Sequence, residues 1–149
     1  MESRSLDMHR SYREAQFKFD NFVLVIILAV CAYLGQSNPY AKIGMNPETM
    51  YFLSLVTLVG AAYFGFRRIE YTIEIYKHNS LQLHVAEVEE QSRVAKTKDL
   101  LVIEKAIIKF KEKTQQFYNR RNRLMLLGIC LYVTAKYWEV YLPVVTNIG

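Results

Sequence analysis

Apolar and charged stretches alternate along the whole chain. The apolar stretches cover residues 22–34, 50–66 and 124–145, and charged or polar stretches separate them. A helix needs about 20 predominantly apolar residues to cross a bilayer. The second stretch approaches that length, the third exceeds it, and the first reaches it if its helix starts near Ala15. The pattern therefore predicts an all-α polytopic membrane protein with three transmembrane helices.

The boundaries of the first two helices carry their own signals. Gly35 is positioned to end the first helix, and residues 35–49 contain two prolines and two glycines, which is typical of a loop. Asn46 is a favourable cap, and Pro47 suits the first helical position of the second span. These residues predict a helix that begins at Pro47.

The region 67–123 is charged and contains neither glycine nor proline. As one straight helix its 57 residues would extend roughly 85 Å, so a third span requires this region to fold back on itself. We expect the turn at Lys96–Asp99, which gives an antiparallel helical hairpin centred near residue 97. Its core is interpreted as that of an ordinary helical hairpin, with a gated or partner-binding coiled coil as the alternative. The expected core stripes are Ile103, Ile107, Phe110, Thr114 and Phe117 on the second arm, and Ile69, Ile73, Tyr76, Leu81, Val85 and Val88 on the first.

The positions of lysine and arginine predict the orientation. Seventeen of the 19 lie in the N-terminal segment or in residues 67–123, and the 35–49 loop holds only Lys42. By the positive-inside rule, the N-terminus and the hairpin are cytosolic and the C-terminus is outside, in a cell (inner) membrane. The predicted domains are residues 1–66, the cytosolic hairpin 67–123, and residues 124–149 with the third span.

Basic residues at the inner ends of the spans are expected to contact lipid headgroups. This set comprises Arg67, Arg68, Arg120, Arg121 and Arg123. Asp20, near the inner end of the first span, is interpreted as a boundary residue, with a proton relay as the alternative.

Small residues form one face of the second span at spacings of three and four. Small side chains let helices approach closely in lipid, where apolar burial gives no driving force. We expect this face to pack against another span of the same chain, or alternatively against another subunit. The predicted packing residues are Ser54, Thr57, Ala61, Gly65 and, on the third span, Gly128.

The third span carries two ionisable residues, Lys136 and Glu139, at i, i+3 spacing, with Tyr132 on the same stripe. They can pair with each other. One interpretation is that they reach the outer interface beside an aromatic belt. The other is that they line an ion path or bind a partner's spans, as intramembrane charges commonly do.

Composition argues against several function classes. The net charge of +5 is not gathered into a basic arm or an aromatic-interleaved patch, so no nucleic-acid partner is expected. Cys31 and Cys130 lie in apolar stretches and are interpreted as small buried hydrophobes. We find no nucleophile–base set, phosphate loop or metal-ligand spacing, and therefore predict no enzyme activity, cofactor or metal.

The layout up to about residue 96 resembles the two-transmembrane effector domains associated with nucleotide-sensing SMODS and SLOG systems of bacteria. The resembling features are Arg10-Ser11-Tyr12-Arg13, two close apolar spans with a short outer loop, and a charged helix that opens Arg67-Arg68-Ile69-Glu70-Tyr71. The resemblance implies a pore-forming or membrane-perturbing effector of defence or stress responses.

Two functions follow from this architecture. The first is a homo-oligomeric membrane protein that forms a pore or perturbs permeability under control of the hairpin, since three spans are too few to enclose a water path. The second is a non-enzymatic adaptor or accessory subunit. Its hairpin would bind a cytosolic protein, and its spans would pack against a larger membrane complex.

Overall fold

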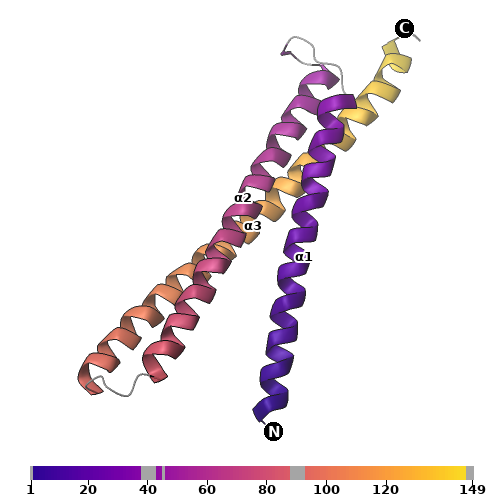
Figure 1. Cartoon of the computed structure of the whole chain (residues 1–149). Helices are drawn as coiled ribbons and strands as arrows, with labels where there is room; N and C mark the ends of the chain where they lie inside the picture. The colour runs from indigo at the N-terminus through magenta and orange to yellow at the C-terminus, as the bar shows by residue number, and fades with distance from the viewer. Residues whose placement is uncertain (1, 38–42, 45, 88–92, 147–149) are drawn as a thin grey trace. The chain divides into compact units, whose positions relative to one another are not determined.

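The computed structural model describes residues 2–37, 43–44, 46–87 and 93–146, and these residues contain three helices and no strand. Helix α1 covers Glu2–Ser37, α2 covers Pro47–Glu87 and α3 covers Arg93–Thr146 (Figure 1). The all-helical prediction is therefore confirmed over the described residues.

The start of α2 agrees with the sequence signals, and the start of α1 does not. The Asn46 side chain accepts a hydrogen bond from the backbone N–H of Thr49 at 2.9 Å, and Pro47 is the first helical residue. Helix α1 begins at Glu2, well before the expected Ala15. Residues 2–20 contain no glycine or proline that would end a helix.

Two helical segments, Arg13–Ser37 and Pro47–Gln82, are long and apolar enough to cross a membrane. Within its described residues α3 has no stretch that is equally apolar. The reason is composition, because Lys136, Glu139 and several tyrosines interrupt its aliphatic residues. By length and composition, two of the three predicted spans meet this criterion.

The chain divides into two compact units. One is the three-helix unit, made of Met1–Gly65 and Arg120–Gly149, and the other is the hairpin unit, Phe66–Asn119. In the three-helix unit the buried apolar side chains come from all three helices. They include Leu24, Ile27 and Leu34 of α1, Tyr51, Leu58, Ala61 and Ala62 of α2, and Ala135 of α3.

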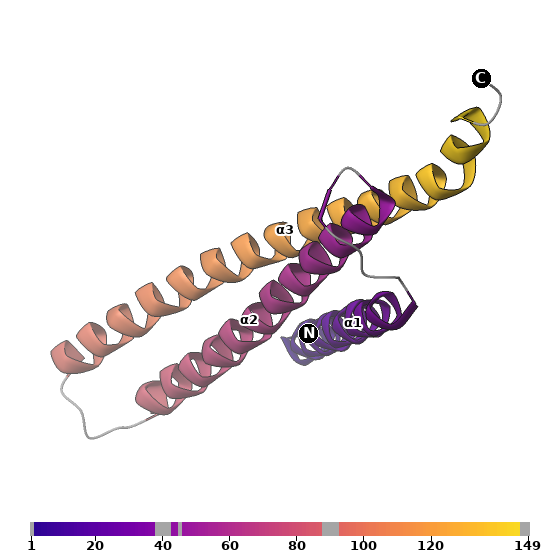
Figure 2. The same cartoon turned by 90° about the horizontal axis from the view of Figure 1, so that it is seen from above.

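In the hairpin unit, α2 and α3 lie side by side and antiparallel (Figure 2). The rings of Tyr71 and Phe117 stack at 5.3 Å, and those of His78 and Phe110 lie 5.2 Å apart. In both pairs the midpoint between the two sequence positions is residue 94. The expected centre near residue 97 is therefore displaced by about three residues.

The turn does not lie where the sequence analysis expected it. Lys96–Asp99 are helical and belong to the first turns of α3, which begins at Arg93. Thr97 and Asp99 have only moderately poor helix propensity, a few tenths of a kcal/mol each, so they do not by themselves break a helix.

The second-arm stripe is correct, whereas the first-arm stripe is wrong at three of its members and only Ile69 among its described residues is half-buried. Ile103 and Ile107 are buried, and Phe110 and Phe117 pack on Tyr71. On α2, however, Tyr71 and His78 provide the packing face. The expected core residues Ile73, Tyr76 and Leu81 are exposed at 44%, 40% and 49%; Val88 and the side chain of Val85 lie outside the described residues.

Candidate functional site

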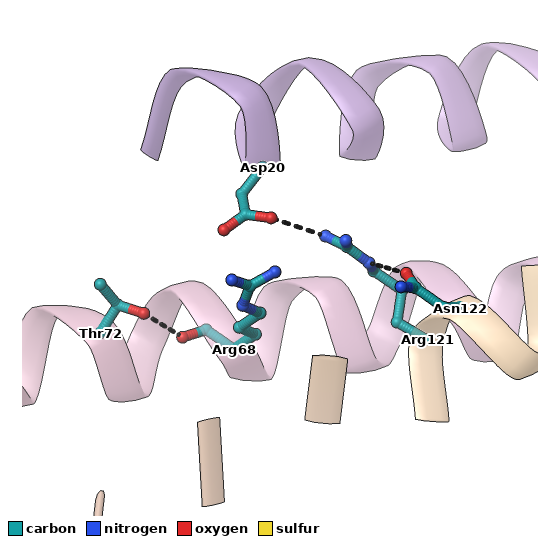
Figure 3. Close-up of polar contacts among 5 residues, drawn as sticks. All are labelled: Asp20, Arg68, Thr72, Arg121 and Asn122. Atoms are coloured by element: carbon teal, nitrogen blue, oxygen red, sulfur yellow. Dashed lines mark hydrogen bonds and ion pairs between the residues drawn. The ribbon is translucent and has the colours of Figure 1, made fainter. Parts of the chain in front are cut away.

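A buried ion pair joins α1 to α3 at one end of the three-helix unit. The guanidinium of Arg121 donates from Nη1 to the Asp20 carboxylate at 3.1 Å, and its Nε donates to the side chain of Asn122 at 3.2 Å (Figure 3). Asp20 and Arg121 are 7% and 2% exposed. Removing one partner from such a pair leaves an uncompensated buried charge, which is strongly unfavourable.

This burial corrects the expectation that Arg121 contacts lipid headgroups. Its side chain is enclosed by protein and pairs with Asp20. Asp20 is accordingly a buried partner in an ion pair, and its position at the membrane boundary stays a prediction.

The other four arginines of that set differ from one another. Arg68 is buried in the hairpin unit, where its guanidinium lies 4.4 Å from the Tyr118 ring centroid. Its backbone carbonyl accepts a hydrogen bond from the Thr72 hydroxyl (Figure 3). It therefore also departs from the headgroup expectation. Arg120 and Arg123 are exposed, with Arg120 over the Phe64 ring, and Arg67 pairs with Glu70.

The small-residue face of α2 lies against α3. The Ser54 hydroxyl is fully buried and donates to the carbonyl oxygen of Gly128 at 2.7 Å. The hydroxyl of Thr57 donates to the carbonyl of Ser54 at 2.8 Å, and Ala61 is fully buried. These residues pack within one chain, which is the first of the two alternatives for this face.

Gly128 allows this close approach of α2 and α3, and Gly65 lies close to Leu24 of α1. A Cβ atom built on Gly128 would lie 2.7 Å from Cγ of Leu58 and 2.9 Å from Oγ1 of Thr57. Real Cβ atoms essentially never show distances under 3.0 Å, so a side chain at 128 requires Leu58 and Thr57, or α2 itself, to shift. Gly65 is less tight, because its added Cβ would lie 3.1 Å from Cδ1 of Leu24.

A second polar cluster lies at the other end of the three-helix unit. The Lys136 ammonium donates to the Glu139 carboxylate at 2.9 Å, as their i, i+3 spacing predicts. The Tyr51 hydroxyl donates to the same carboxylate oxygen at 2.6 Å. Lys136 also lies over the Tyr51 ring at 5.2 Å, and the rings of Tyr51 and Tyr132 are 5.7 Å apart.

The position of Tyr51 defines the level of this cluster. Tyr51 lies one turn after Pro47, so the cluster is beside the end of α2 that follows the 35–49 loop. Tyr51 is buried, whereas the side chains of Lys136 and Glu139 are 48% and 49% exposed. The ionic groups are thus bonded to each other and still half accessible.

The two polar clusters enclose an apolar zone. On α3, Arg121 and Lys136 are 15 residues apart, which corresponds to about 23 Å of helix. The outward faces of the same helices carry large exposed apolar side chains. Examples are Val25, Ile26, Leu28 and Val30 on α1, Phe52, Leu53, Val56 and Val59 on α2, and Leu126, Leu127, Ile129 and Val133 on α3.

Sequence reasoning missed Tyr51 and Asn122 as members of these clusters. No local pattern marks Tyr51, because its partner Glu139 is 88 positions away. The available signal was the acceptor capacity of the Glu139 carboxylate, since a carboxylate paired with one lysine can still accept a hydrogen bond from a donor on a neighbouring helix. Within the described part of the chain no three His, Cys, Asp or Glu side chains are grouped as a metal site.

Comparison with known proteins identifies no relative of this chain. No protein family, no curated protein and no solved structure matches it. The argument about function therefore depends on the contacts described above.

Proposed function

We propose that this chain is an integral membrane protein with three spans, a cytosolic N-terminus and hairpin, and an outer C-terminus in a cell (inner) membrane. The observation that carries this proposal is the apolar zone of about 23 Å between Arg121 and Lys136. A hydrocarbon core is about 30 Å thick. Outward apolar faces on all three helices support the same view, because lipid is the solvent that such a surface needs.

The third span is part of this proposal although its composition is less apolar. Its two charges do not sit at the middle of the zone. They pair with each other and with Tyr51 one turn from the start of α2, a level at which charged and aromatic groups reach the headgroup region.

Cysteine labelling of intact cells tests this topology. Asn147→Cys should react with a membrane-impermeant maleimide added outside, and Lys98→Cys should react only after the membrane is permeabilised. Each variant carries Cys31→Ala and Cys130→Ala as a common background. If both positions fall in the same compartment, residues 124–145 do not cross the membrane.

For the activity, we propose a homo-oligomer that forms a pore or perturbs permeability, controlled by the hairpin and acting without enzyme chemistry. Lys136 and Glu139 support this because they are half exposed in a single chain, so they are available to line an outer mouth. The layout shared with membrane-perturbing defence effectors of the SMODS and SLOG type points to the same activity.

Leakage measurements test the activity. Expression in bacteria, or reconstitution in liposomes loaded with a dye, should increase permeability. Lys136→Leu or Glu139→Gln should change the rate of leakage. Thr134→Val is the matched control, since Thr134 is exposed on the same helix and its hydroxyl bonds within α3. Oligomers that release no dye with any of these variants would contradict the pore.

One observation favours the second candidate function, a membrane adaptor or accessory subunit. The small-residue face and the Glu139 carboxylate already have partners within the chain, so neither requires another subunit. For an adaptor, substitutions on the exposed hairpin surface should abolish function. Glu139→Gln should then leave function intact.

A further inference from the structure

The hairpin unit has an apolar and charged stripe on the outward side of α2. Tyr71 and His78 make the packing face of this helix. Ile73 follows Tyr71 by two residues, about 200° around the helix, and therefore lies on the opposite side. The outward stripe, which we call the α2 stripe, consists of the exposed or half-buried residues Phe66, Glu70, Ile73, Lys77 and Ser80, at spacings of four and three.

Helix α3 has a matching stripe opposite its own packing face. Phe110 packs inward on Tyr71 and His78, whereas Ile108 and Glu112, two positions before and after it, are exposed on the other side. The α3 stripe consists of Leu101, Lys105, Ile108, Glu112 and Gln115, all exposed. Each hairpin thus has two outward stripes on opposite sides.

We propose that the α2 stripe of one copy packs against the α3 stripe of the next copy, so that the hairpins associate head to tail into a ring. The proposal rests on the membrane insertion proposed above. Copies in one membrane share an orientation and a level, and this sets which residues can meet. The occupant of each stripe is accordingly a second copy of this chain.

Because neighbouring copies lie at the same height, residues of α2 in one copy face the residues of α3 in the next that lie at the same height within a single hairpin. Positions symmetric about residue 94 lie at the same height in the hairpin unit, as Tyr71 with Phe117 and His78 with Phe110 do. By the same rule Ser80 meets Ile108, beside Leu81, and Ile73 meets Gln115. Lys77 lies within one residue of the level of Glu112, and these two side chains have opposite charges.

The alternative contacts between like stripes are electrostatically unfavourable. Because the copies are parallel, an α2–α2 contact would place Lys77 against Lys77 and Glu70 against Glu70. An α3–α3 contact would place Glu112 against Glu112 and Lys105 against Lys105. Like charges that face each other in an interface are unfavourable, so charge selects the α2–α3 contact.

The geometry of the two stripes then determines the kind of assembly. A symmetric dimer would need both stripes to meet the same partner at once, and stripes on opposite sides of a hairpin cannot do this. A contact between different surfaces of identical chains repeats from copy to copy, and closes into a ring when the rotation allows. The bilayer confines that repeat to one plane.

Cysteine cross-linking in membranes tests the contact. In a Cys31→Ala, Cys130→Ala background, a chain with both Ser80→Cys and Ile108→Cys should give a ladder of dimers, trimers and higher species after oxidation. Ser80→Cys with Leu101→Cys is the control, because Leu101 is displaced from Ile108 by seven residues, about 10 Å. It should cross-link at least tenfold less.

Each other outcome counts against the proposal. A dimer formed by Ser80→Cys alone would indicate a symmetric contact and overturn the head-to-tail arrangement. Protein that is inserted in the membrane but gives no ladder overturns the ring contact and leaves the topology intact. Protein recovered outside the membrane fraction overturns both proposals.

Charge reversal tests the Lys77–Glu112 contact separately. Lys77→Glu and Glu112→Lys should each reduce the yield of the ladder several-fold, and the double variant should restore it. Lys111→Glu is the matched control, since Lys111 is exposed next to Glu112 but lies about 100° around the helix. Failure of the double variant to restore the ladder would show that these two charges do not meet.

Discussion

The two units of this chain hold the same two helices together by different means. In the three-helix unit, α2 and α3 approach through Ser54 and Gly128, where an added methyl group would clash with Leu58. In the hairpin unit, aromatic rings separate the helices, with Tyr71 stacked on Phe117 and a guanidinium over Tyr118. This contrast is the one expected of the proposed topology, since apolar burial stabilises packing in water and close backbone contact does so in lipid.

The difference also concerns charge. In the three-helix unit a carboxylate and a guanidinium are both buried and bonded to each other. In the hairpin unit, cations lie over rings and ion pairs such as Lys77–Glu74 are at the surface. Exposed pairs of this kind contribute little. Substitutions should therefore affect the two units very unequally.

The largest effect is expected at the buried ion pair. Arg121→Leu should lower the free energy of unfolding in detergent by about 3–5 kcal/mol, because it leaves the Asp20 carboxylate buried without its partner. A control is the double variant Asp20→Leu with Arg121→Leu, which removes both charges and should recover most of the loss. If the double variant is as unstable as the single one, packing and not charge explains the effect.

The next largest effect is expected where the helices are closest. Gly128→Leu should destabilise the protein by about 3 kcal/mol, since overpacking of this kind forces helices apart. Gly60→Ala is the matched glycine control. Its added Cβ would be 3.4 Å from Leu124, an acceptable contact, and alanine favours the helix by up to about 1 kcal/mol. A stable Gly128→Leu protein would contradict the close contact.

A smaller loss of unfolding free energy is expected from substitution in the aromatic cluster of the hairpin unit. Tyr71→Leu keeps an apolar side chain but removes ring contacts with Phe110 and Phe117, each worth about 0.5–1.5 kcal/mol. We therefore expect a loss of about 2 kcal/mol in thermal or denaturant unfolding. Tyr76→Leu, at an exposed position, should change stability by less than about 0.5 kcal/mol.

The smallest effect on stability is expected from the removal of one hydrogen bond. Ser54→Ala removes the donor to the Gly128 carbonyl, which should cost about 1 kcal/mol. Because alanine retains the small size, the helices should stay in contact, and the loss measured by denaturant unfolding should stay near that value. A loss as large as that of Gly128→Leu would mean that the hydroxyl, and not the size, sets the approach.

The parts of the fold that the sequence predicts depend on local rules. Asn46 followed by Pro47 identifies the start of α2, and the small-residue spacing identifies the face that contains Ser54. The i, i+3 spacing identifies the Lys136–Glu139 pair. Each of these features involves residues within about three helical turns, so a single stretch of sequence contains the relevant information.

The parts that it does not predict depend on which long-range partner a side chain finds. Ile73 has the greater hydropathy, yet Tyr71 packs inward, because its ring stacks on Phe110 and Phe117. Arg121 belongs to a basic run typical of headgroup contact, yet Asp20, 101 positions earlier, buries it. Helix α3 also begins earlier than the turn expected at Lys96–Asp99 allows. A local signal for this start was present, because Ser92, a residue type favoured at helix starts, directly precedes Arg93.

Gly128 imposes a constraint on how this chain can diverge. Leu58 and Thr57 occupy the space that any other side chain at this position would need. Substitution there requires a simultaneous reduction at 57 or 58, for example to alanine or glycine. Among descendants of this sequence these three sites should change together or not at all, a covariation that a deep mutational scan of paired variants would reveal.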